Sequence, residues 1–312
     1  MPANPKALVV LALALMSGAC RAVAEANATA QKPRPSGEYS LHYQGRNRTY
    51  TIRLPQGRES EVGLPLVVAL HGAPGDAANL EQFTALTEKA GREGFIIVYP
   101  NGTSAESKTF LNWNSGSCCG YAWQNKVDDL GFLRLLAIRL TQEYEVDRER
   151  IYALGFSKGG MLAYLLACEA ADIYTGFADI GGAFNYGDCR PAHETEMLIV
   201  HGRKDPAIPF GTGVPDRRSP LADDESRPVE FAVDFWRRFN GCVAQKTKHE
   251  KGAEITRYAC ERGKLRLIVF PEDGHVWPGA LAGLAGAERA SSSLSLNDAI
   301  WQFWREPKKP LR

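Results

Sequence analysis

Short apolar runs separated by stretches of helical spacing constrain the fold of this chain most strongly. From about residue 40 the runs are YTIRL, LPLVVALHG, GFIIVYPNG, RIYALG, GFADIGG, MLIVHG and LRLIVF. The stretches with helical spacing cover residues 78–92, 128–145, 158–171, 229–239 and 294–305. Strands that are apolar throughout are buried on both faces, and strands that alternate with helices form parallel sheets. We therefore expect an α/β fold with a mostly parallel central sheet and helices on both faces.

The N-terminus has the pattern of a secretory signal peptide. Lys6 precedes an apolar run over residues 7–16, and the small residues that follow offer cleavage after Ala24 or Ala26. Residues 1–24 are therefore predicted to direct secretion, to the cell exterior or the periplasm. The apolar run is shorter than the roughly 20 residues that a membrane-spanning helix needs, and no later run is longer, so we expect no integral membrane segment.

Lipoprotein anchoring through Cys20 is an alternative, but Ser17 stands where a leucine-like residue is usual. Residues 25–38 are polar and contain two prolines, which predicts a disordered lead-in. No repeat or break in composition follows. Residues 39–312 are therefore expected to form a single catalytic domain.

Six of the seven cysteines remain once the signal peptide is removed, and an even number in an exported chain suggests three disulfides. Cys242 and Cys260 flank a short segment and are expected to pair. The pairing of the other four is left open: Cys118, Cys119, Cys168 and Cys189. The two adjacent cysteines are expected to bond different partners. No spacing is typical of a zinc site, so we expect no metal.

The strand RIYAL leads directly into Gly155-Phe156-Ser157-Lys158-Gly159, the G-x-S-x-G pattern of a nucleophile elbow. Side chains two positions either side of the serine would collide in so sharp a turn. The backbone N–H of Lys158, at the start of a helix, is the expected oxyanion donor, with its side chain in solvent or at the cleft rim. Alone, the pattern also fits a helix start with a serine cap.

An acid and a base follow the serine at the ends of two later strands. MLIVHG is followed by RKDPAIPF, which contains Asp205, and LRLIVF by PEDGHVWPG, which contains His275. Reacting groups gather at the carboxyl ends of parallel strands, and the order Ser, acid, His is that of a G-x-S-x-G hydrolase. His275 is expected to take the proton of Ser157, while Asp205 holds the tautomer of the imidazole.

Other residues fit these catalytic roles less well. His71 and His201 lie at strand ends just before a glycine and are expected to orient loops. Asp223 and Asp224 lie in the polar stretch PLADDESRP, which indicates a solvated loop.

Three more residues are candidates around the serine. The backbone N–H of Ala73, in LHGAPG after a buried strand, is the candidate second oxyanion donor. Trp113 and Trp277 are candidate substrate-contacting aromatics, and core packing is the alternative for both.

The composition is that of an ordinary globular protein, with 44% hydrophobic and 23% charged residues. The formal net charge is +1 and no basic stripe is present. Nucleic acid is therefore not an expected partner.

Several segments together resemble a known family: ALHGAPGDAANLEQFTAL, GFIIVYPNGT, NWNSGSCCG, VDDLGFL, GFSKGGMLAYLLACEAAD, IVHGRKDPAIPF and GHVWPG. Over residues 40–305 the chain is similar to secreted α/β-hydrolases grouped as poly(3-hydroxybutyrate) depolymerase-like esterases and feruloyl esterases. The resemblance implies an α/β-hydrolase fold and a serine esterase without metal or organic cofactor. It implies the nucleophile, acid and base at Ser157, Asp205 and His275. The implied substrate is a feruloyl or other acyl ester, or a 3-hydroxybutyrate oligomer.

The chain departs from this family's pattern at two positions and in its organisation. Lys158 stands where Asn or Ala is frequent, and EDGH where glycines often precede the base. The linker and binding module typical of depolymerases that act on solid polyester are not found in this sequence, which favours soluble esters. Two alternatives stay open: a secreted serine peptidase of the same fold, and a non-catalytic secreted binding protein with a spoiled site.

Overall fold

The computed structural model describes residues 33–106, 110–116, 120–211, 227–280 and 292–308. The predicted signal peptide, Cys20, the first part of the lead-in and the adjacent cysteines at 118–119 lie outside these ranges. The first strand, β1, begins at Gly37, two residues before the expected start of the folded domain.

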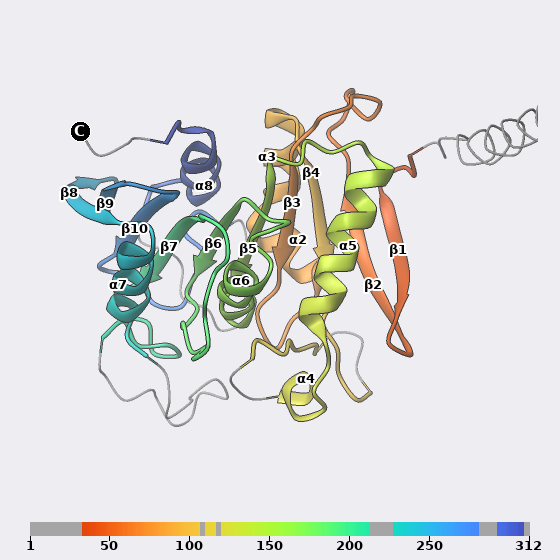
Figure 1. Cartoon of the computed structure of the whole chain (residues 1–312), viewed down its shortest axis with the longest axis horizontal. Coiled ribbons are helices and arrows are strands. Elements are labelled where there is room, and N and C mark those ends of the chain that lie inside the picture. Colours follow the sequence, from red (N-terminus) through yellow and green to blue (C-terminus); the bar gives the residue numbers. More distant parts are fainter. Residues whose placement is uncertain (1–32, 107–109, 117–119, 212–226, 281–291, 309–312) are drawn as a thin grey trace, which may run out of the picture. The chain divides into compact units, whose positions relative to one another are not determined.

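In the described residues, ten strands form one sheet in the order β1-β2-β4-β3-β5-β6-β7-β10-β9-β8 (Figure 1). The central strands are parallel to one another: β3 (Leu66–Leu70), β4 (Ile96–Pro100), β5 (Ile151–Phe156), β6 (Gly176–Ile180), β7 (Glu196–Gly202) and β10 (Lys264–Phe270). Antiparallel strands complete both edges: β1 (Gly37–Tyr43), β2 (Arg46–Arg53), β8 (Cys242–Glu250) and β9 (Ala253–Cys260). The predicted mostly parallel sheet is confirmed.

Helices cover both faces of the sheet, as predicted (Figure 1). One face packs against α5 (Asp129–Glu143), α6 (Lys158–Glu169) and α7 (Val229–Phe239). The other packs against α2 (Ala77–Thr84), α3 (Leu86–Glu93) and α8 (Leu296–Arg305). A short helix, α4, spans Gly120–Gln124. Within the described ranges, no helix has both the length and the apolar character needed to cross a membrane.

The structure differs from the sequence-based elements in a few places. The stretch 78–92 was expected to be one helix, but it is split into α2 and α3 at Ala85, whose φ of 54° is left-handed and interrupts helical geometry. β1, β8 and β9 were not predicted. β1 and β9 mix exposed or half-buried residues with buried ones, and β8 is polar throughout after its first three residues, so none of the three shows the continuous apolar run of a buried strand.

Two disulfides are present in the described residues. Cys242 and Cys260 are bonded and lie opposite each other on β8 and β9, so this prediction is confirmed. Cys168 and Cys189 join the end of α6 to the segment after β6. The adjacent cysteines at 118–119 lie outside the described residues.

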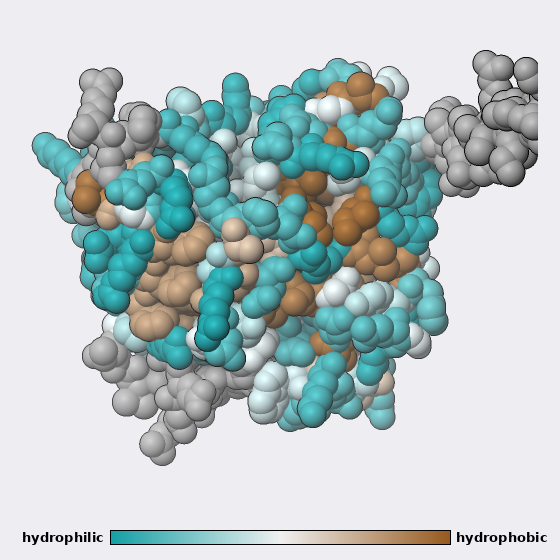
Figure 2. Space-filling model, in the orientation of Figure 1, coloured by the Kyte–Doolittle hydropathy of each residue, from teal (hydrophilic) through white to brown (hydrophobic). Residues whose placement is uncertain are grey.

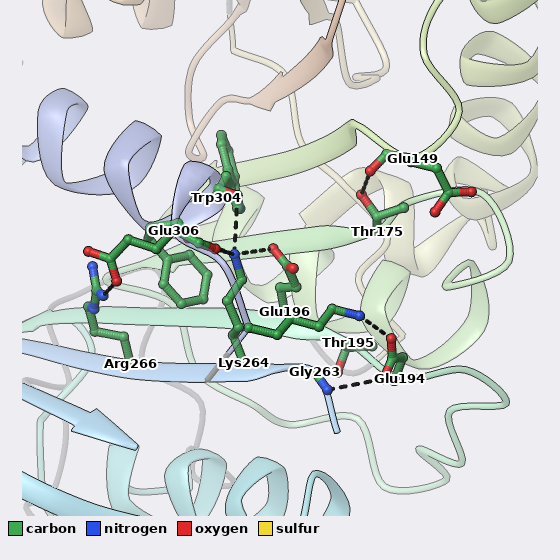
Figure 3. Close-up of polar contacts among 12 residues, drawn as sticks. Glu149, Thr175, Glu194, Thr195, Glu196, Gly263, Lys264, Arg266, Trp304 and Glu306 are labelled. Carbon is green, nitrogen blue, oxygen red and sulfur yellow. Dashed lines mark hydrogen bonds and ion pairs between the residues drawn. The ribbon is translucent and has the colours of Figure 1, made fainter. Parts of the chain in front are cut away.

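A buried lysine holds the C-terminus of α8 against the sheet (Figure 3). Lys264, at the start of β10, is only 9% exposed and forms an ion pair of 2.8 Å with Glu196. Its Nζ donates to the backbone oxygens of Phe303 (2.8 Å), Trp304 (3.1 Å) and Glu306 (2.9 Å). Lys264 therefore satisfies carbonyls at the end of α8 that have no partner within the helix.

Replacing Lys264 with Met should lower the free energy of unfolding by about 3 kcal/mol, because Glu196 and the carbonyls of α8 would lose their buried partner. The matched control is Lys308→Met, which removes an ion pair with Glu194 whose side chains are both about half exposed. The control should cost less than about 1 kcal/mol in urea unfolding. Equal costs for the two variants would contradict this role of Lys264.

Candidate active site

Ser157 occupies a strained turn between β5 and α6. Its φ of 55° and ψ of −118° lie outside the regions that serine ordinarily adopts. The side chain makes no capping hydrogen bond to α6, and Oγ is buried without a hydrogen-bond partner in the described part of the chain. Ser157 therefore occupies the N-cap position of α6 without capping the helix through its side chain, which was the alternative that the pattern alone allowed, and its hydroxyl is left available for other chemistry.

The glycines around Ser157 allow backbone to lie directly against backbone. A Cβ on Gly155 would collide with the carbonyl oxygen of Gly159, and a Cβ on Gly159 would collide with that of Leu70 in β3. The structure thus agrees with the prediction that side chains at these two positions would collide with the backbone. The first turn of α6 thus sits against β5 and β3 with no side chain between them.

Gly159→Ala should lower the free energy of unfolding by at least about 2 kcal/mol, because the new methyl group would push α6 away from β3. Gly91→Ala is the matched control. Gly91 lies in α3, and a methyl group added there would have no neighbouring atom within 4 Å, so alanine should stabilise the protein by about 0.5–1 kcal/mol. Urea unfolding measures both, and a mild effect of Gly159→Ala would refute the packing argument.

Asp205 and His275 form a close hydrogen-bonded pair at the ends of β7 and β10. His275 Nδ1 donates to Asp205 Oδ2 at 2.6 Å. The other carboxylate oxygen accepts the backbone N–H groups of Ala207 and Ile208, each at 2.8 Å. With both oxygens engaged, the carboxylate has a fixed orientation, and Nε2 of His275 is the ring nitrogen left to exchange a proton.

The surroundings of Asp205 favour its ionised form. Burial would raise the pKa of this carboxyl, but the hydrogen bond and charge of His275, with His201 and the N–H of Ile208, lower the pKa below its ordinary value of 3.8. His201 is itself buried, which lowers its pKa, and its Nε2 donates to the carbonyl of Ile208 at 2.7 Å. A neutral His201 therefore orients the loop that carries Asp205, in the role expected from its position.

The turn after β6 brings the serine and the histidine together. The N–H of Ser157 donates to the carbonyl of Ile180 at 2.8 Å. The next residue, Gly181, lies under the imidazole, since a Cβ there would be 3.4 Å from Nδ1 and Cε1 of His275. The His275 ring also lies 4.9 Å from the ring of Phe156, centroid to centroid. Ser157 and His275 therefore both contact the same turn, at Ile180 and Gly181.

The loop after β3 lies beside the serine. A Cβ on Gly72 would be 3.2 Å from the Cβ of Ser157, and Ala73 follows directly. His71 Nδ1 donates to the carbonyl of Gly72 at 2.7 Å, and His71 Nε2 accepts the N–H of Gly102 at 3.0 Å. Complete burial lowers the pKa of His71 to about 4, so the ring is neutral and fixes this loop.

The structure decides between the two alternatives for the tryptophans and departs from the expectation for the side chain of Lys158. Trp113 is fully buried and its Nε1 donates to the carbonyl of His71, while Trp277 is 2% exposed and donates to Asn297. Core packing, the alternative for both tryptophans, is what the structure favours over substrate contact. The side chain of Lys158 is also fully buried rather than in solvent or at the rim, because α6 is buried from Lys158 to Cys168.

One acidic residue of this region, Asp179 near the end of β6 (Gly176–Ile180), was not predicted from the sequence. It is fully buried and accepts hydrogen bonds from the Tyr164 hydroxyl (3.1 Å) and the N–H of Gly182 (2.9 Å). Burial raises its pKa to about 8. The available signal was a single carboxylate inside the otherwise apolar run GFADIGG.

A hollow of about 550 Å³ lies over α7, where apolar side chains gather on the face shown in Figure 2. Its lining residues are Cys189, Arg190, Pro191, Phe235, Arg238 and Phe239. These residues bring no hydroxyl, histidine or carboxylate for acid–base chemistry. Across the described ranges, no group of three or more His, Cys, Asp or Glu side chains could hold a metal ion.

Comparison with known proteins identifies the family. The family model described as esterase PHB depolymerase matches residues 48–220, more than half of the chain. The chain belongs to this family of carboxylic ester hydrolases. Feruloyl esterase B of Piromyces equi is 27% identical over 242 residues, which cover 73% of this chain and 42% of that protein. Feruloyl esterase C of Emericella nidulans is 25% identical over 262 residues, 82% of this chain and 83% of that protein.

The solved structures agree with the fold. An acetyl xylan esterase from Aspergillus awamori superposes with a TM-score of 0.58 at 14% identity, covering 86% of this chain and 98% of that one. At this identity the likeness concerns the fold alone. The expected α/β-hydrolase fold is confirmed, and the family expected from the sequence motifs is the one that matches.

Proposed function

We propose that this esterase acts through a Ser157–His275–Asp205 triad and a covalent acyl-enzyme. The observation that carries the proposal is the 2.6 Å pair of Asp205 and His275, held on the same turn that supports the strained Ser157. The three groups come from the ends of β5, β7 and β10 and occur in the chain order of the G-x-S-x-G hydrolases.

Acylation begins when Ser157 Oγ attacks the ester carbonyl carbon and His275 Nε2 takes the hydroxyl proton. Asp205 stabilises the imidazolium that forms. The carbonyl electrons move onto oxygen, where the N–H groups of Ala73 and Lys158 hold the oxyanion at the N-terminus of α6. As the tetrahedral intermediate collapses, the bond to the alcohol oxygen breaks and the imidazolium gives its proton to the leaving alcohol.

Deacylation repeats these steps with water in place of the serine hydroxyl. His275 takes a proton from water, the resulting hydroxide attacks the acyl carbon, and Ser157 leaves with the proton that the imidazolium returns. The acid product is released and the serine is regenerated. No metal or organic cofactor takes part in this scheme.

The proposed substrates are soluble esters: feruloyl or other acyl esters, or 3-hydroxybutyrate oligomers. The family match and the feruloyl esterases among the relatives support this range. The protein is proposed to be secreted through the signal peptide at residues 1–24. The two disulfides found among the described residues support an oxidising compartment.

Ser157→Ala should lower kcat/KM for p-nitrophenyl acetate by at least about a thousandfold, because the nucleophile is lost. Ser40→Ala, on the exposed face of edge strand β1, is the control and should keep the wild-type rate. A fluorophosphonate probe should label the wild type and the control but not Ser157→Ala. Wild-type turnover by Ser157→Ala would overturn the assignment of the nucleophile.

Substrate preference is tested by comparing initial rates on methyl ferulate and on a soluble 3-hydroxybutyrate oligomer, with Ser157→Ala as the blank. We expect the higher rate on methyl ferulate, since the two relatives described above are feruloyl esterases. A higher rate on the oligomer would assign a polyester-degrading role instead. No hydrolysis of either would exclude both substrate classes.

A further inference from the structure

Asp179 has an environment that is unusual for a carboxylate. It lies at the end of β6, between Gly155 of β5 and Ile199 of β7, and has no exposed surface. Tyr164 of α6 donates to Oδ2 at 3.1 Å, and the N–H of Gly182 donates to Oδ1 at 2.9 Å. The carboxyl group therefore joins a helix to the turn that follows its own strand.

The contacts of Oδ1 are close enough to exclude side chains around it. A Cβ on Gly160, in the first turn of α6, would collide with this oxygen, and so would a Cβ on Gly182. The same position on Gly182 would be 2.8 Å from the backbone nitrogen of Met161. The carboxyl group thus fills the space between the start of α6 and the turn after β6.

Both partners of this contact lead directly to the reacting groups. The turn after β6 holds Ser157 through the carbonyl of Ile180 and supports the ring of His275 through Gly181. The first turn of α6 begins at Lys158, whose N–H is the proposed oxyanion donor. A shift of either element would move the serine relative to the histidine.

We propose that Asp179 is a positioning residue for the esterase reaction, tying the Gly181–Gly182 turn to the first turn of α6 so that Ser157, His275 and the oxyanion donors keep their relative positions. Asp179 touches neither substrate nor the reacting atoms. The proposal rests on the proposed triad, because Ser157 and His275 are the groups that it positions.

The charge of Asp179 decides whether this arrangement helps catalysis. The titratable groups that face it are Tyr164 from α6 and Asp205 from the loop after β7, while β5 and β7 present Gly155 and Ile199. Within the described residues, no ion pair joins Asp179 to a cation. Burial raises its pKa to about 8, so the group is a neutral acid at pH 7.

A neutral acid suits this position beneath the start of α6. The positive end of the helix dipole is then available for the oxyanion that forms on the substrate. An ionised Asp179 would place a fixed negative charge close to that oxyanion and to Asp205. Ionisation above about pH 8 should therefore slow the chemical step, with kcat falling up to tenfold per pH unit for one proton lost.

Two variants test the proposal through the pH profile of kcat on p-nitrophenyl acetate. Asp179→Asn keeps the shape and the acceptor for Gly182 but does not ionise, so it should keep kcat at pH 7 within about threefold and lose the alkaline decline. Tyr164→Phe removes a hydrogen bond that lowers the pKa of Asp179 and should move the decline to higher pH. If Asp179 had a purely structural role, neither variant would change the pH at which kcat declines. An unchanged decline of kcat at alkaline pH in Asp179→Asn would refute the proposal.

Two readouts do not depend on the triad. The infrared difference between wild type and Asp179→Asn at pH 6 should contain the carbonyl band of a protonated carboxylic acid, and its absence would overturn the neutral state. Neutral Asp179 stabilises the fold fully below pH 3.8, and this contribution should be lost as pH rises to about 8, so the melting temperature of wild type should fall relative to Asp179→Asn over that range. Activity in Ser157→Ala would instead indicate failure of the proposed triad, which these two measurements do not touch.

Discussion

The site depends on direct backbone contact between the first turn of α6 and the strands beneath it. Because Gly155 and Gly159 carry no side chains, the helix begins against the carbonyl of Leu70, and the chain turns sharply enough to hold Ser157 at a φ of 55°. The same contact places the N-terminus of α6 next to the loop after β3, where Gly72 approaches the serine Cβ. One constraint on packing thus fixes both Ser157, the proposed nucleophile, and the helix end that is proposed to stabilise an oxyanion.

The other groups of the candidate site lie on loops, and buried histidines hold the loops after β3 and β7 in place. In the loop after β3, His71 donates to the carbonyl of Gly72 and accepts the N–H of Gly102. In the loop after β7, His201 donates to the carbonyl of Ile208, close to Asp205. Both rings are buried, and burial lowers the pKa of each, so they act as neutral connectors with a fixed tautomer. The uncharged hydrogen bonds of these two rings therefore help to order the loops beside Ser157 and Asp205.

The sequence predicted those parts of the structure that depend on local patterns. Continuous apolar runs predicted the buried strands, and residues directly after them, such as Asp205 and His275, could be assigned to one edge of the sheet. Features set by distant contacts were missed. The break at Ala85 follows a carbonyl, that of Thr84, which accepts a hydrogen bond from Asn297, and the place of Asp179 depends on β5 and β7 on either side of its strand. Spacing carries no information about such contacts.

Asp205 and Asp179 lie at the ends of neighbouring strands and have the same side chain, but their surroundings shift their pKa values in opposite directions. Asp205 and Asp179 are both buried, and burial alone raises the pKa of each. Asp205 faces an imidazole and two backbone N–H groups, which outweigh burial and keep it charged. Asp179 accepts hydrogen bonds from a phenol and one N–H and lies near the charge of Asp205, so burial prevails and its pKa is raised to about 8. In the proposed mechanism the charged Asp205 stabilises an imidazolium, and a neutral Asp179 leaves the positive end of the α6 dipole to the oxyanion.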